Sequence, residues 1–98
     1  MRILVKFCET LLAEENFGVV TDLTIDLKCF GETAVWYEKF CNSLASYTFL
    51  KKLKIINRGA QVVEKGKYNG FPIGKFLNET QNCEWLVVEV SVLRFFTD

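Results

Sequence analysis

A chain of 98 residues, half of them hydrophobic, can bury one compact core but is too short for two, so we expect a single domain spanning residues 1–98. Its twelve basic and twelve acidic side chains cancel, which excludes a net field that would draw the whole molecule to nucleic acid or to an anionic membrane. The sequence has no histidine, which excludes every catalytic arrangement built on an imidazole, and we expect a protein that is not an enzyme.

The four cysteines are widely spaced, and no two of them form the short pair that metal sites use. Because no histidine could complete a ligand set, we expect no metal and no other cofactor. The apolar run at the start of the chain is interrupted by Lys6 and Glu9, which makes it too short for a signal peptide or a membrane span. We therefore expect a cytoplasmic protein whose cysteines are reduced.

The first thirty residues predict two strands and a short helix. Residues 2–7 alternate between apolar and polar side chains well enough for a strand. Residues 9–15 are rich in leucine, alanine and glutamate, which favours a short helix. Residues 19–30 show the cleanest alternation in the chain, which predicts a strand with one face in water.

The main helix is predicted over residues 32–45. Trp36, Phe40 and Leu44 recur there at the spacing of one helix face. Aromatic and aliphatic side chains in such a stripe usually form the side of a helix that packs on a sheet. We therefore expect this helix to cover one face of the sheet.

The following residues predict a hairpin and then a loop. Residues 47–56 return to the alternation of a strand, and residues 57–59 end in a glycine that suits a tight turn. The return strand is predicted at residues 60–65. Residues 66–82 contain three glycines and the one proline of the chain, which predicts an irregular loop.

Residues 83–96 form the longest run of β-branched and aromatic side chains, and both faces of the run are mostly apolar. A strand that is apolar on both faces is typical of the centre of a sheet or of an interface with a partner chain. If this strand instead ends the sheet, we expect a homodimer across residues 83–96.

These elements predict an α+β fold, with a mostly antiparallel sheet of about five strands and the helix over 32–45 packed on one face. A second, short helix is expected near residues 9–15. No internal repeat is apparent in the sequence.

Basic side chains concentrate in residues 51–75, where seven of them stand against one acidic residue. Within this segment, residues 65–76 interleave lysines with aromatic rings and glycines, as platforms for single-stranded nucleic acid do. We expect the surface that contacts a partner to consist of Lys52, Lys54, Arg58, Lys65, Lys67, Tyr68 and Phe71.

The sequence favours a small intracellular binding protein that inhibits or modulates a larger protein or ribonucleoprotein stoichiometrically. Separation of charge into a basic middle and acidic flanks favours fast and selective docking. Anti-defence proteins of phages and mobile elements, the anti-CRISPR type, are of this kind. Two alternatives stay open. One is an RNA or single-stranded nucleic-acid binder that uses the loop 65–76. The other is an enzyme in which Cys8 or Cys41 is the nucleophile, or in which Tyr37 and a carboxylate carry protons.

Overall fold

The computed structural model describes residues 1–26, 42–58, 71–93 and 96–97. The main sheet consists of β1 (Arg2–Val5), β2 (Asp22–Asp26), β3 (Lys52–Ile56) and β5 (Trp85–Val88). Two short strands, β4 (Phe71–Pro72) and β6 (Phe96–Thr97), form a separate small sheet. The helical segments are α1 (Cys8–Leu12), the 3₁₀ helix η1 (Glu14–Asn16), residues 42–46, α3 (Ile73–Glu79) and α4 (Val90–Leu93). None of these described helices is long and apolar enough to cross a membrane.

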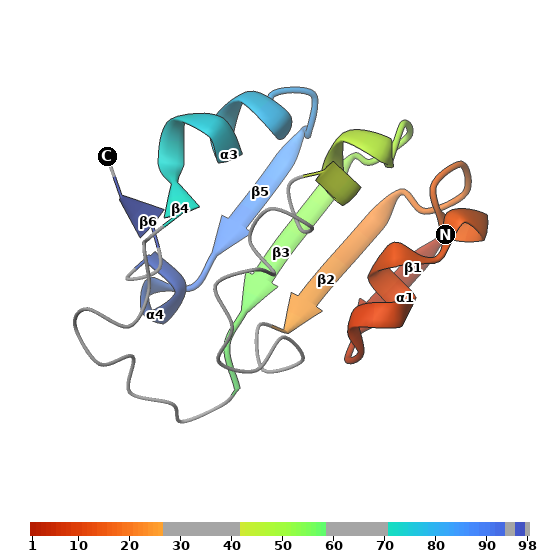
Figure 1. Ribbon diagram of the computed structural model, residues 1–98, viewed down its shortest axis with the longest axis horizontal. Coiled ribbons are helices and arrows are strands. Elements are labelled where there is room, and N and C mark those ends of the chain that lie inside the picture. The colour runs from red at the N-terminus through yellow and green to blue at the C-terminus, as the bar shows by residue number, and fades with distance from the viewer. Residues whose placement is uncertain (27–41, 59–70, 94–95, 98) are drawn as a thin grey trace.

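All four strands of the main sheet are parallel, in the order β1-β2-β3-β5, and the arrows of β2, β3 and β5 point the same way in Figure 1. The predicted antiparallel sheet of about five strands with one main amphipathic helix is therefore wrong. Each strand is joined to the next by a long connection rather than by a tight turn. A connection of that length is long enough to return the chain to the end of the sheet where it started, as parallel neighbours require.

The predicted hairpin after β3 is not compatible with this sheet. β3 is already paired on one side with β2 and on the other with β5, so it has no free edge for a return strand. The return strand itself was predicted at residues 60–65, which lie outside the described residues. Alternation of side chains identified β3 as a strand but contained no information about its partners.

The apolar run 83–96 is not one central strand. It begins with β5, which is the last strand of the described main sheet, and continues as α4 and then β6. β3 ends at Ile56, so a longer β5 would have had unpaired backbone groups beyond Val88. The chain turns instead at Glu89, whose N–H donates to the carbonyl of Ile55 at 3.1 Å.

The structure agrees with part of the helix prediction and corrects another part. A short helix follows β1 as expected, and residues 42–46 are helical, whereas the rest of the predicted 32–45 helix lies outside the described residues. Residues 66–82 are not simply a loop, because they contain α3. Phe76 of α3 is 2% exposed, so this segment contributes to the core despite its glycines.

One hydrophobic cluster lies between the main sheet and the helices. The strands contribute alternate residues to it, namely Ile3, Val5, Leu23, Ile25, Leu53, Ile55, Leu86 and Val88. The helical segments contribute Leu11 from α1, Leu44 from residues 42–46, Phe76 from α3 and Val92 from α4. We call this side of the main sheet the inner face. Burial of each large apolar side chain there is worth about 1.5–3 kcal/mol, so the inner face dominates the stability of the fold.

The register of the sheet brings out a repeat that inspection of the sequence missed. Leu23, Leu53 and Leu86 are register partners, and so are Ile25, Ile55 and Val88. Three residues before each of these leucines is another side chain of the core, at Val20, Leu50 and Cys83. The shared spacing is apolar-x-x-apolar-x-apolar, and it recurs at intervals of roughly thirty residues.

The backbone repeats in the same way where the strands begin. The carbonyl of Met1 accepts from the N–H groups of Thr21 and Asp22, at 2.9 and 3.2 Å. The carbonyl of Thr21 accepts in turn from the N–H groups of Lys51 and Lys52, where β3 begins. The carbonyl of Lys51 accepts from those of Glu84 and Trp85, where β5 begins. The strands are therefore successive copies of one local structure, stacked side by side.

Candidate functional site

The side of the main sheet opposite the inner face carries charged, polar and aromatic side chains. The alternate positions of the four strands point to this side. The two rows nearest the strand starts are Arg2, Leu4, Asp22, Thr24, Lys52, Lys54, Trp85 and Val87, and we call these residues the outer face. The next pair on the same side, Asp26 and Ile56, is not part of it, and Ile56 is only 5% exposed. None of the outer-face residues belongs to the hydrophobic cluster into which the described helices insert. Leu4 is 42% exposed and Trp85 is 48% exposed, so these two large apolar side chains of the outer face are open to solvent.

The register arranges the outer face in two rows that run across the strands. The first row is Arg2, Asp22, Lys52 and Trp85, and the second is Leu4, Thr24, Lys54 and Val87. Neighbouring members of a row are about 4.8 Å apart, which is the spacing of strands in a sheet. A hollow of about 280 Å³ lies over these rows, lined by Arg2, Asp22, Leu23, Thr24, Lys52, Lys54 and Trp85.

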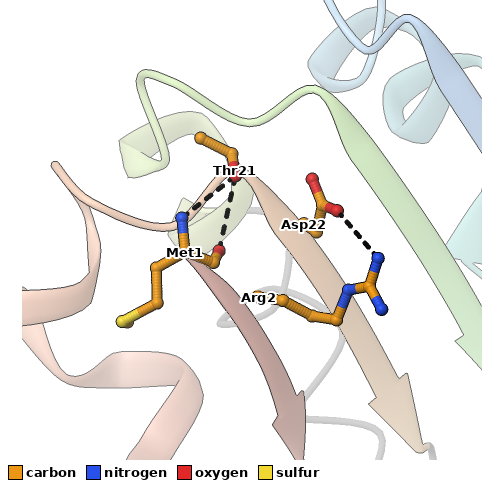
Figure 2. Close-up of polar contacts among 4 residues, drawn as sticks. All are labelled: Met1, Arg2, Thr21 and Asp22. Atoms are coloured by element: carbon orange, nitrogen blue, oxygen red, sulfur yellow. Dashed lines mark hydrogen bonds and ion pairs between the residues drawn. The ribbon is translucent and has the colours of Figure 1, made fainter.

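Charge on the outer face divides between its two halves. Figure 2 shows the side chain of Arg2 reaching from β1 to β2, where its Nη2 lies 3.6 Å from Oδ2 of Asp22. This is the one ion pair between described residues, so Lys52 and Lys54 on β3 have no carboxylate partner among them. The β1 and β2 half is therefore locally neutral, and β3 presents two positive charges beside the indole of Trp85.

The two carboxylates at the opposite end of β3 have structural roles. Oδ1 of Asp26 accepts the N–H of Arg58 at 3.2 Å, and Oε2 of Glu89 accepts the N–H of Asn57 at 3.4 Å. These bonds satisfy backbone groups that follow the last residue of the strand. Within the described ranges, no group of three or more His, Cys, Asp or Glu side chains could hold a metal ion.

Two described side chains that could take part in proton transfer or nucleophilic attack have raised pKa values. Burial raises the pKa of Tyr47 to about 12, and its hydroxyl donates to the carbonyl of Leu11 at 2.7 Å. Burial also raises the pKa of the Cys83 thiol, which lowers the fraction present as thiolate at neutral pH. Cys41, one of the two nucleophiles considered from the sequence, lies outside the described residues, and Cys8 lies in α1.

The structure brings together two of the seven predicted contact residues. Lys52 and Lys54 lie on one face of β3, as the alternation predicted. Arg58 follows the other end of this strand, and its six residues of separation from Lys52 correspond to about 20 Å. Phe71 is in β4, in the small separate sheet, and Lys65, Lys67 and Tyr68 lie outside the described residues.

Sequence reasoning missed Arg2, Asp22 and Trp85 as neighbours of the two lysines. Their contact depends on parallel pairing, which places the first residues of all four strands in one row. The signal that could have found them is the repeated apolar spacing, because aligning Leu23, Leu53 and Leu86 also aligns the residues that precede them.

Comparisons of the chain with protein-family models, with curated proteins and with solved structures found no match. Its functional interpretation therefore rests on the geometry of the described residues.

Proposed function

We propose that this chain is a non-enzymatic binding protein that holds a macromolecular partner on its outer face and modulates that partner stoichiometrically. The observation that carries the proposal is an all-parallel sheet whose described helices all insert into one side. Parallel sheets are usually covered on both faces. The described helices leave the outer face free, and it has a hollow, an exposed tryptophan and two lysines without a carboxylate partner among the described residues.

The repeat supports the same function. The last three of the four sequential parallel strands have an apolar-x-x-apolar-x-apolar spacing, and helical segments lie between the strands along the chain. Such a pattern is typical of solenoids such as the leucine-rich repeats. Solenoids form extended concave surfaces that bind other macromolecules, and their strands line one side of such a surface. The described strand order also never reverses, so this sheet has no switch point of the kind at which open α/β sheets bind nucleotides.

The proposal can be tested with a matched pair of substitutions. Trp85 on the outer face and Leu77 on α3 are similarly exposed, at 48% and 50%. Trp85→Arg and Leu77→Arg therefore add the same charged side chain to two different surfaces. We expect the tagged wild-type protein to recover a stoichiometric partner from cells that naturally contain it, and we expect Trp85→Arg but not Leu77→Arg to lose that partner.

The opposite pattern, in which Leu77→Arg loses the partner and Trp85→Arg retains it, would contradict the proposal. Thermal unfolding of both variants is the control for folding. Binding of RNA or single-stranded DNA through the loop 65–76 is the second candidate. An absorbance ratio at 260 and 280 nm that is high in purified material and falls after a salt wash would favour it.

A further inference from the structure

We infer that the outer face recognises an acidic, extended segment of a partner protein through Lys52, Lys54 and Trp85. This inference rests on the proposed function, because it specifies the chemistry of the partner that the outer face would hold. It concerns the β3 and β5 half of the outer face. The observations that carry it are the lack of ion-pair partners for the two lysines among the described residues and the neighbours that the sheet register gives them.

The two lysines present a fixed spacing. They are two residues apart on one face of β3, so their Cβ atoms are about 7 Å apart. An extended peptide laid along β3 has the same spacing between alternate side chains, since both backbones rise about 3.3 Å per residue. Two acidic residues separated by one residue would therefore meet Lys52 and Lys54 together.

The neighbours of each lysine leave most of its charge available. Lys54 lies between Thr24 and Val87, which are both uncharged. Lys52 lies beside Asp22, but the carboxylate of Asp22 is already paired with Arg2. The positive charge of β3 is thus only partly offset within the described sheet. A carboxylate of the partner would neutralise the rest.

The β5 side of the hollow is apolar. Trp85 and Val87 are the register partners of Lys52 and Lys54, and the indole of Trp85 is half exposed. An exposed tryptophan beside cationic groups suits a segment that carries both acidic and apolar side chains, because aromatic anchors supply much of the energy in protein interfaces. The hollow of about 280 Å³ holds a few side chains of such a segment.

A nucleic acid fits the outer face less well. Binding a phosphate backbone needs a positive groove that follows the strand over several nucleotides. The positive stripe here is one strand wide, because the charges of Arg2 and Asp22 are paired with each other and the β5 members of the outer face are uncharged. Two lysines on one strand match two acidic residues of a protein segment, whereas a run of phosphates would extend beyond them.

The test uses three fluorescent probes of similar length: a peptide that repeats Glu-Ser-Glu-Leu, the same peptide with Gln in place of Glu, and an oligothymidylate. We expect the acidic peptide to bind the wild-type protein, the Gln peptide to bind about tenfold more weakly, and the affinity to fall as salt is added. The double substitution Lys52→Glu with Lys54→Glu should weaken binding of the acidic peptide by about tenfold or more relative to the wild-type protein.

Lys51→Glu is the matched control, because Lys51 is also exposed and immediately precedes the strand but does not belong to the outer face. It should leave the affinity for the acidic peptide within about twofold, since exposed charges off the site contribute little. Equal binding of the Glu and Gln peptides, no binding of the acidic peptide, or tighter binding of the oligothymidylate would each overturn the inference.

The failure of this inference is distinguishable from failure of the proposed function. If Trp85→Arg loses the natural partner while Lys52→Glu with Lys54→Glu retains it, the outer face binds a partner that is not acidic. If Trp85→Arg also retains the partner, the outer face is not the binding surface and both proposals fail.

Discussion

The two faces of the main sheet are built from the same four strands but contain different side chains. The inner face has Val5, Leu23, Ile25, Leu53 and Ile55, each at most 1% exposed. The outer face has two lysines, an ion pair and a half-exposed tryptophan in the alternate positions. Because side chains of a strand alternate in direction, every second residue contributes to the core, and the outer-face residues between them are at least partly open to solvent.

This difference separates stability from recognition within single strands. Ile55 on the inner face is fully buried, whereas its neighbour Lys54 is only partly buried. Substitutions at adjacent positions should therefore differ sharply in their effect on unfolding, and this comparison can be tested one residue at a time.

The largest effect is expected from truncation of the inner face. Ile55→Ala should lower the free energy of unfolding by about 2–5 kcal/mol, because it removes buried methyl groups and leaves a cavity. Lys54→Ala, one residue away, should change it by no more than about 0.5 kcal/mol. Urea denaturation of the two variants measures both values. Similar losses for the two substitutions would mean that the faces are not divided as described.

A smaller effect is expected from the hydroxyl of Tyr47. Its ring packs edge-on against Phe17, with centroids 5.1 Å apart, and its hydroxyl bonds the carbonyl of Leu11. Tyr47→Phe keeps the ring and leaves that carbonyl without its donor, so we expect a loss of about 1–2 kcal/mol in urea denaturation. Phe17→Leu, which keeps the hydrogen bond and removes the ring contact, separates the two contributions. An unchanged midpoint for Tyr47→Phe would show that the hydrogen bond does not stabilise the fold.

The same hydroxyl predicts a dependence on alkaline pH. Burial raises the pKa of Tyr47 from 10.0 to about 12 in the folded protein, so the folded chain holds the neutral phenol more strongly than the unfolded chain does. The stability that this phenol contributes is therefore complete below pH 10.0 and is lost as the pH rises toward about 12. The difference in unfolding free energy between wild type and Tyr47→Phe should shrink over that range. A constant difference would mean that Tyr47 ionises as readily in the folded state as in the unfolded state.

The smallest effect is expected on the outer face itself. Arg2 is 81% exposed and Asp22 is 26% exposed in their ion pair, so solvent and salt screen the attraction between them. Arg2→Ala should cost about 0.2–1 kcal/mol at low salt and less at high salt. Chemical denaturation by urea at two salt concentrations gives the comparison. A loss as large as that of Ile55→Ala would place this pair among the determinants of the fold.

The sequence predicted where strands form better than how they pair. Alternation located β1, β2 and β3 and placed Lys52 and Lys54 on a common face. It could not give strand direction, because parallel and antiparallel strands can show the same alternation. The information was present in the lengths of the connections and in the repeated spacing that begins at Val20 and Leu50.

Two segments were misread for local reasons. The apolar run 83–96 predicted a long central strand, but the length of β5 is limited by β3, its one neighbour among the described strands. Gly74 and Pro72 predicted a loop, although the proline directly precedes α3, where its missing N–H does not disturb a helix. In both cases tertiary contacts decided the structure that the local pattern left open.

The central claim is that the outer face is open in the folded protein. Trp36→Phe leaves Trp85 as the single tryptophan, so its fluorescence reports on this face alone. We predict that the folded variant emits at a wavelength close to that of indole in water and is quenched efficiently by acrylamide before any unfolding. A blue-shifted emission that acrylamide quenches only after unfolding would show that the outer face is covered, and would contradict the account.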